Sequence, residues 1–269
     1  MNHLLRELAP VSGEAWSAVE EEATRTLRHF LAARKVVDFS GPKGWDHSAE
    51  TLGRVDALGA TPADGVDAAI RRLQPLAELR TPFELSRREV EAIDRGSRDY
   101  DLQAVIDAAQ RAATAEDAAA FHGYDAAGIA GISEASPHDP LHIADDYHDY
   151  PGTVARAVAN LQAAGIAGPF AIALGPRCYR GVIETTEHGG YPVLEHIRLI
   201  LGGPVVWAPA VNGAIVVSLR GGDFELTCGE DFSIGYLDHD ADTVRLYLEE
   251  SMTFRALSPE AGIALTYAD

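Results

Sequence analysis

The hydrophobic and polar positions form their first regular pattern just after the start of the chain. Apolar side chains recur every three or four residues, as on one face of a helix. These are Trp16, Val19, Ala23, Leu27, Phe30 and Leu31. Ser12 is a favourable N-cap, and Arg25 and Arg28 follow a group of acidic residues in the order that a helix dipole favours. The pattern predicts an amphipathic helix whose apolar face is covered.

The pattern after this helix changes to short strands and turns. Residues 36–39 favour a strand, which the turn formers that follow bring to an end. Residues 46–76 have a weaker pattern with a reversal at 61–65, and they predict a long two-stranded excursion. Residues 77–85 then alternate between apolar and polar side chains, and Pro82 favours an edge position for that strand.

Helices and strands alternate through the rest of the chain, which ends in strands. Ser86 and Glu89 have the spacing of a capping box and predict a short helix ending near Gly96. A longer helix is expected from Asp101 to Gly123, where glycine permits a left-handed cap. Further helices are expected at 153–164 and 193–201, and strands at 170–174, 205–208, 215–219, 224–228, 233–236 and 243–254.

Composition and charge narrow the class of protein. The 269 residues carry 41 acidic and 22 basic side chains and a net charge of −19, so the surface repels phosphate backbones and we expect no nucleic-acid partner. No apolar run approaches the roughly 20 residues of a membrane span, and the first ten residues lack the apolar centre of a secretory signal. We therefore expect a cytoplasmic protein without a membrane partner, whose self-association depends on shape-matched contacts.

The sequence lacks the signature motifs of catalysis. Neither the glycine-rich loops of dinucleotide and phosphate sites, nor GxSxG, nor HExxH is present. Cys178 and Cys228 stand alone, and nothing near Cys178 supplies an activating base. We expect no catalytic residue, no cofactor and no bound metal.

One acidic segment comes close to a calcium-binding loop. Asp238, Asp240, Asp242 and Glu249 occupy the first, third, fifth and twelfth positions of such a loop. Its sixth position requires glycine and here holds Thr243, after which apolar and polar residues alternate as in a strand. A turn followed by a strand explains the segment.

A second segment contains enough imidazole and carboxylate groups for a metal site. Its residues are His138, His142, Asp145, Asp146, His148 and Asp149. Pro140 disfavours a regular helix between the first two histidines, and acidic runs of this kind are usually solvated loops. A metal-dependent hydrolase stays open as an alternative function.

Several tracts along nearly the whole chain together resemble one family. They begin with Leu8-Ala9-Pro10 and Trp16, Arg34-Lys35-Val36-Val37-Asp38, Gly41-Pro42-Lys43-Gly44-Trp45 and Leu52-Gly53. They continue with Glu187-His188-Gly189-Gly190-Tyr191-Pro192, Arg220-Gly221-Gly222-Asp223-Phe224, Ser233-Ile234-Gly235-Tyr236 and Asp242-Thr243-Val244-Arg245-Leu246-Tyr247. In this order and at these spacings they resemble the family 1 encapsulins, the linocin- or bacteriocin-like shell proteins.

This resemblance implies an α+β fold of the tailed-phage major-capsid-protein type. Residues 1–45 are then the N-terminal helix and arm on the luminal side of a peripheral domain, and residues 46–76 are an extended loop that reaches onto a neighbouring subunit. The peripheral domain continues through 77–123 and 220–269, and residues 124–219 form an axial domain around the symmetry axes.

The resemblance also implies a function without catalysis. The chain is expected to assemble with itself into an icosahedral compartment of the smallest, T=1, size. It is expected to enclose a peroxidase or ferritin-like cargo protein by binding the targeting peptide of that protein. The matching positions for this peptide are Leu27, Leu31, Arg34, Asp38 and Phe39 on one wall and Asp231, Ile234 and Tyr236 opposite.

A pore follows from the same resemblance. Identical loops from several subunits are expected to surround an opening on the fivefold axis. The loop residues are Glu184, Glu187, His188, Gly189, Gly190 and Tyr191. A ring of such carboxylates favours cations, and histidine adds sensitivity to pH. A solvated loop is the open alternative.

A viral or prophage capsid protein of the same fold is the other alternative function. Such a shell encloses nucleic acid and needs a basic interior, which a net charge of −19 disfavours.

Overall fold

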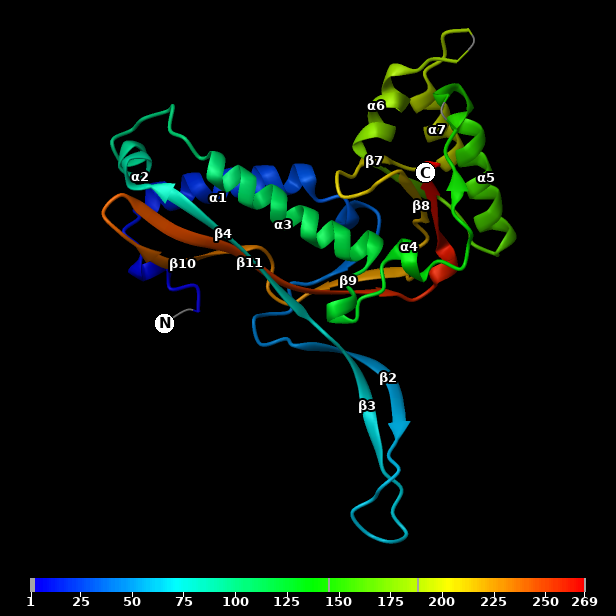
Figure 1. Ribbon diagram of the computed structural model, residues 1–269, viewed down its shortest axis with the longest axis horizontal. Helices are drawn as coiled ribbons and strands as arrows, with labels where there is room; N and C mark the ends of the chain where they lie inside the picture. Colours follow the sequence, from blue (N-terminus) through cyan, green and yellow to red (C-terminus); the bar gives the residue numbers. More distant parts are fainter. Residues whose placement is uncertain (1–2, 145, 188, 269) are drawn as a thin grey trace.

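Two lobes lie side by side in the computed structural model, and a thin arm extends from the body between them (Figure 1). The structure describes residues 3–144, 146–187 and 189–268. Each lobe is built on its own sheet, and the arm is a separate pair of strands. No helix among these residues has both the length and the apolar character needed to cross a membrane.

The first lobe packs two long helices on a five-stranded sheet. Its strands are β1 (Asp38–Ser40), β4 (Ala77–Ser86), β9 (Phe224–Cys228), β10 (Ser233–His239) and β11 (Thr243–Ala256). The long strand β11 pairs with β4 along one side and with β10 and then β9 along the other. Helices α1 (Gly13–Phe30) and α3 (Gln103–His122) cover the sheet, and the apolar side of α1 is buried against it and α3.

The second lobe surrounds another five-stranded sheet with three helices. Its strands are β5 (Leu141–His142), β6 (Phe170–Leu174), β7 (Val205–Trp207), β8 (Ala214–Ser218) and β12 (Gly262–Thr266), in the order β5-β12-β8-β6-β7. Its helices are α5 (Tyr150–Ala163), α6 (Pro176–Glu184) and α7 (Val193–Leu201). Every residue of β6 and β8 is buried, so both faces of these two strands are covered.

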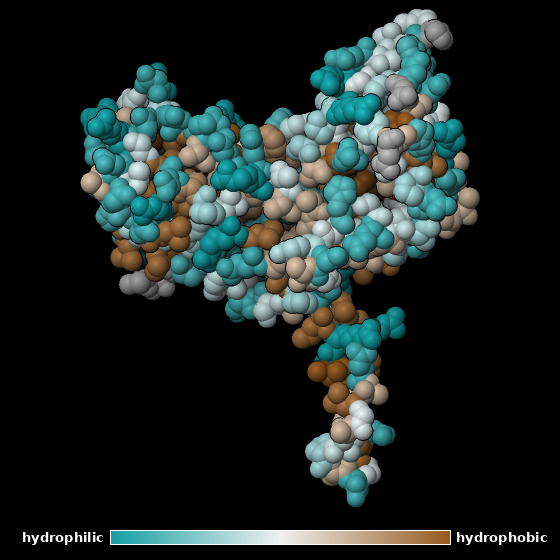
Figure 2. All heavy atoms as spheres, in the orientation of Figure 1, coloured by the Kyte–Doolittle hydropathy of each residue, from teal (hydrophilic) through white to brown (hydrophobic). Residues whose placement is uncertain are grey.

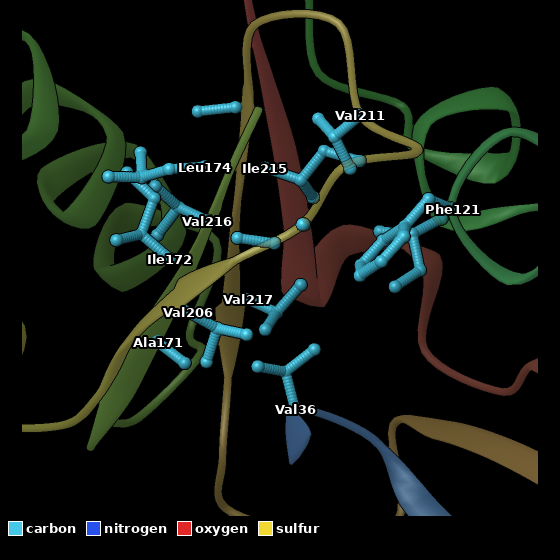
Figure 3. Close-up of a cluster of buried hydrophobic side chains, with 14 of the residues drawn as sticks. Val36, Phe121, Ala171, Ile172, Leu174, Val206, Val211, Ile215, Val216 and Val217 are labelled. Carbon is cyan, nitrogen blue, oxygen red and sulfur yellow. The ribbon is translucent and has the colours of Figure 1, made fainter. Parts of the chain in front are cut away.

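One hydrophobic core joins the two lobes. Val36, which follows α1, and Phe121, near the end of α3, lie among the side chains of β6 and β8 (Figure 3). Leu226 of β9 and Phe254 of β11 belong to the same cluster. The first sheet is therefore anchored to the second lobe at the end where β9 and β11 pair.

The arm consists of β2 (Ala49–Ala57) and β3 (Ala69–Pro75), paired antiparallel with a bulge. At its base, Lys43 and His47 contact the carboxylate of Glu50 at 2.5 and 2.8 Å. Apolar surface follows the arm outward from the body (Figure 2). Exposed apolar side chains on the arm are Val55, Leu58, Val66, Ile70 and Leu73. A two-stranded ribbon of this kind is marginal in water without a partner.

Most of the predicted elements are confirmed. Strand β6, helix α7 and strand β9 have the expected bounds, and β4 pairs with β11 alone, so Pro82 does lie on an edge strand. The remaining short helices are α2 (Arg87–Asp94), α4 (Ile132–Ala135) and 3₁₀ turns at Arg6–Leu8, Ala33–Lys35, Asp125–Ala127, Tyr147–Asp149 and Pro259–Ala261.

Three local predictions were wrong in detail. The strand expected at 36–39 begins at Asp38, because a 3₁₀ turn occupies Ala33–Lys35. The capping box does not form: the Ser86 hydroxyl accepts from the Arg88 amide, and the Glu89 carboxylate accepts from the amide of Asp101 instead. Gly123 has φ 101° and ψ 166°. Glycine can adopt this backbone conformation, but it is not the left-handed conformation that was expected at the end of the helix.

The sequence pattern did not predict several elements, of which α6 and β12 are the longest in the second lobe. Strand β12 pairs with β8 and β5 in the second sheet. The expected grouping of 220–269 with the first lobe therefore differs from the structure at this strand. Ile263 and Leu265 are fully buried and extend the core of the second lobe, which explains why the chain returns there.

Candidate functional site

The turn after α1 is held in place by a buried carboxylate. Asp117 on α3 accepts hydrogen bonds from the amides of Ala32 and Ala33 at 2.9 and 2.8 Å. Burial raises the pKa of Asp117 to about 7, although these amides favour the ionised form. The contact fixes the direction in which the next residue, Arg34, leaves the helix.

Arg34 connects four elements of the first lobe. Its guanidinium donates to Glu116 of α3 at 2.5 Å, to Asp231 at 2.8 Å and to Glu250 of β11 at 3.2 Å. It also stacks over the rings of Phe39 and Phe232, at 4.6 and 5.1 Å from their centroids. We call Arg34, Glu116, Asp231 and Glu250 the Arg34 cluster.

The Arg34 cluster is buried on one side and reaches the surface on the other. Glu116 and Glu250 are fully buried, whereas the Asp231 side chain is 42% exposed. Burial, together with the neighbouring Glu116, raises the pKa of Glu250 well above its usual range. Asp231 is therefore the part of the cluster that another molecule can touch, together with the adjoining Phe39, which is 37% exposed.

A pocket of about 250 Å³ adjoins the cluster. Its walls come from α1, β10, β11, Phe232 and the segment before α1, and they present both polar and apolar side chains, with more polar than apolar surface exposed. The lining residues are Leu4, Arg6, Glu20, Ala23, Thr24, Leu27, Phe232, Ser233, Ile234 and Leu248. Because Phe232 both lines the pocket and stacks on Arg34, pocket and cluster form one continuous strip.

The structure brings together some of the expected peptide-binding residues and separates others. Leu27 and Ile234 line the pocket. Arg34, Phe39 and Asp231 meet beside it.

Three further expected residues do not line this pocket. Leu31 and Tyr236 are buried in the core of the first lobe, as Leu27 and Ile234 also are, and the Tyr236 amide donates a hydrogen bond to the Leu4 carbonyl at 2.8 Å. Asp38 accepts a hydrogen bond from the amide of Gly222 at 2.6 Å, on the face of β1 opposite Phe39.

Sequence reasoning missed Phe232, Glu116 and Glu250. Phe232 lies between two residues that were named, and its aromatic side chain was the available signal. Glu116 interrupts the alanine-rich buried stripe of α3, and Glu250 stands inside the long strand β11. A charged residue within an apolar pattern was thus the signal for the buried half of the cluster.

The expected pore residues lie far from this strip, on the loop between α6 and α7 in the second lobe. Glu184 is exposed at the end of α6. The Oε1 atom of Glu187 lies 2.6 Å from Nδ1 of His196. The Glu187 amide donates to the Tyr191 carbonyl at 2.7 Å, which closes the loop.

The remaining expected pore residues are the two glycines, the tyrosine and the histidine of this loop. Gly189 and Gly190 have φ of 114° and 85°, conformations that favour glycine. Tyr191 is 46% exposed. His188 lies outside the described residues.

The segment resembling a calcium loop is a β-hairpin. Asp240 accepts from the amides of Asp242 and Thr243, and these bonds lower its pKa to about 2. Arg245 pairs with Asp240 and with Asp238, while Glu249 pairs with Arg80. The interpretation as a turn followed by a strand is confirmed.

The histidine and aspartate segment does not converge on one point among the described residues. His138 contacts the Glu260 carbonyl at 2.9 Å, and His142 lies in β5. His148 pairs with Asp146, and Asp149 ends a 3₁₀ turn; Asp145 lies outside the described residues. Cys178 is buried and lies 2.9 Å from the Tyr267 hydroxyl.

Residues 1–253 match a family model described as "Encapsulating protein for peroxidase". The chain is 54% identical to the type 1 encapsulin shell protein of Rhodospirillum rubrum, over 98% of this chain and 96% of the relative. It is 44% identical to the shell protein of the same name from Mycobacterium tuberculosis, over 99% and 100% of the two chains.

Solved structures share the fold at low sequence identity. A virus-like particle from Pyrococcus furiosus has a TM-score of 0.64 at 16% identity and covers 93% of this chain and 98% of its own. The capsid of an empty GTA particle has a TM-score of 0.55 at 14% identity, covering 89% of this chain and 90% of its own. The expected α+β capsid-like fold is confirmed.

These findings agree on a subunit that assembles into a particle. The relatives are named shell proteins and not enzymes, and the structural neighbours are particles and capsids. A capsid-like lobe pair with an arm of exposed apolar side chains suits that role. The chain is a shell subunit of the encapsulin family, type 1.

Proposed function

We propose that this subunit forms a small icosahedral shell in the cytoplasm and loads its cargo through a peptide bound along the strip from Phe39 to the pocket. The observation that supports this site is the joining of that pocket to an arginine that has one exposed carboxylate partner, Asp231. An extended tail can place apolar side chains against Phe39 and Phe232 while its polar groups meet Arg34, Asp231 and the polar side chains of the pocket. Many copies within one shell strengthen a modest individual affinity.

Peroxidases are the cargo class that the family description supports, and ferritin-like proteins are the second class we propose. A relative from Kuenenia stuttgartiensis, 23% identical, is named a diheme-cytochrome-encapsulin shell fusion protein. In that relative a redox protein and the shell share one chain. For this protein we propose instead that the cargo is a separate chain, which binds the shell through its tail.

The first test replaces Phe39 with aspartate. Phe39 is 37% exposed, so the change leaves the core intact but places a charge on the strip beside Arg34. Loss of one buried apolar contact, at about 1.5–3 kcal/mol, lowers peptide affinity by roughly 10- to 100-fold. The measurement is the amount of a fluorescent protein, fused to the C-terminal tail of a peroxidase cargo, that co-purifies with particles.

Leu237→Asp provides the matched control for this test. Leu237 is 44% exposed on β10 of the same lobe and does not line the pocket. Its particles should load the fluorescent protein as the wild type does. Equal loading by Phe39→Asp particles would move the binding site elsewhere.

We propose the following roles for the parts of the chain in the shell. The first lobe is the peripheral domain, with residues 1–45 on its luminal side, and the second lobe is the axial domain. Residues 46–76 form the extended loop. The exposed apolar side chains of that arm support its packing against a neighbouring subunit.

We also propose that the loop between α6 and α7 lines an opening through which cations enter. Glu184 and Glu187 are the carboxylates of this ring in each subunit. Replacing both with glutamine is expected to slow Fe²⁺ entry roughly tenfold, because a charged ring raises the local cation concentration. The measurement is the initial rate of iron oxidation by an enclosed ferritin-like protein.

Glu84→Gln with Glu91→Gln removes the same charge from the first lobe and serves as the control. Both side chains are exposed, at 62% and 58%. This control should leave the rate of Fe²⁺ entry unchanged. If both double variants slow entry equally, total charge and not the loop governs it.

A further inference from the structure

We propose that Cys228, Asp231 and Glu250 form a binding site for a thiophilic divalent cation such as Zn²⁺. One ligand atom from each of these residues lies within 4.8 Å of the other two. Zinc bonds of about 2.0–2.3 Å place tetrahedral ligand atoms roughly 3.5 Å apart. Side-chain rotations that move these atoms by about 1 Å therefore bring all three within bonding distance of one ion. Three protein ligands with a water molecule are a normal zinc coordination.

Backbone hydrogen bonds hold the three residues in this arrangement. Cys228 ends β9 and lies opposite Met252 of β11 in the register of the sheet. The Gly229 amide donates to the Ser251 carbonyl at 2.8 Å, and the Ser251 amide donates to the Glu230 carbonyl at 3.0 Å. The turn from Cys228 to Asp231 is thus fastened beside Glu250 by the backbone.

Arg34 leaves one side of each carboxylate available. It contacts Oδ1 of Asp231 and Oε2 of Glu250. Oε1 of Glu250 is buried without a hydrogen-bond partner among the described residues, and Glu250 is fully buried. A buried carboxylate oxygen that accepts nothing is costly, and a cation supplies the missing partner.

The charges of the site suit a divalent ion. Asp231, Glu250 and Glu116 bring three carboxyl groups together, and Arg34 is the one cation that the described residues place among them. A divalent cation adds the positive charge that this acidic cluster lacks.

The ligand types select the metal. A thiolate favours Zn²⁺ or Co²⁺ over Mg²⁺ and Ca²⁺, which prefer oxygen ligands alone. Cys228 and Glu250 are buried, and the 42% exposed side chain of Asp231 is the contact with solvent. An ion reaches the site past Asp231, beside the strip proposed for the cargo peptide.

Cobalt binding tests the proposal, because thiolate ligation of Co²⁺ produces a charge-transfer band in the near ultraviolet. Wild-type particles titrated with Co²⁺ should develop this band, and Zn²⁺ should abolish it. Cys228→Ser should lose the band, whereas Cys178→Ser, which alters the other buried cysteine, should keep it. Glu250→Gln should weaken Co²⁺ binding by at least the roughly 10- to 100-fold that loss of a supporting group costs.

A second measurement guards against effects of folding. Zn²⁺ should raise the thermal unfolding midpoint of the wild type and of Cys178→Ser, but not that of Cys228→Ser. Absence of the band in the wild type, or a band that survives in Cys228→Ser, would overturn the proposal. Glu250 would then have only a structural role, as a partner of Arg34.

Discussion

Replacing Ile70 and Leu73 with aspartate is expected to leave the subunit folded and to prevent particle formation. Both side chains lie on β3 of the arm and are 58% and 54% exposed. Neither belongs to a core of the two lobes. If a neighbouring subunit covers them, their burial contributes about 1.5–3 kcal/mol per side chain. Losing two such contacts weakens each subunit pairing by two orders of magnitude or more.

Size-exclusion chromatography with light scattering measures this outcome, and circular dichroism checks the fold. Ile70→Val with Leu73→Ile is the matched control, because it keeps both positions apolar, and it should still assemble. Particles formed normally by the aspartate variant would show that the arm does not carry the assembly contact. Unfolding of the isolated subunit would show that the arm is part of its core.

Replacing Arg34 with methionine is expected to lower the free energy of unfolding by about 3–5 kcal/mol. The change removes the only cation that the described residues bring to Glu116 and Glu250, and both carboxyl groups are fully buried. Breaking a buried ion pair costs this much because a charge stays behind without a partner. For a chain of this size the thermal midpoint should fall by roughly 6–20 °C.

Arg245→Met is the control for the burial argument. Arg245 also contacts three carboxylates, those of Glu84, Asp238 and Asp240, but its partners are 50–62% exposed. Exposed pairs contribute about 0–1 kcal/mol, so this variant should melt close to the wild type. Adding Glu116→Gln to Arg34→Met should restore part of the stability. An equal loss in both single variants would contradict the explanation.

The sequence pattern was sufficient to predict a helix with one regular apolar face and a strand in which every residue is buried. Helix α7 and strand β6 were predicted with the right bounds because their apolar residues are dense and their ends are marked by proline and glycine. Helix α6 was missed because it buries only Cys178 and Val182. Strand β12 was missed because its partners β8 and β5 precede it by tens of residues.

The candidate site was predictable only in part for a similar reason. Arg34 and Asp231 stand in tracts that resemble the family, and the structure joins them at 2.8 Å. Glu116 and Glu250 are 82 and 216 residues from Arg34 in sequence, so no local spacing connects them. Their burial depends on tertiary contacts, and the signal that each leaves in the sequence is a charge within an apolar pattern, which does not name its partner.

The place of β12 between β5 and β8 has a consequence for the order of events on the ribosome. The second sheet lacks its second strand until residues 262–266 have been synthesised, since among the described residues β12 alone joins the edge strand β5 to β8. A nascent chain can form β6, β7 and β8 but cannot complete the lobe. We therefore expect chains cut short before β12 to expose the unpaired edges of β5 and β8 and to assemble less well than complete chains.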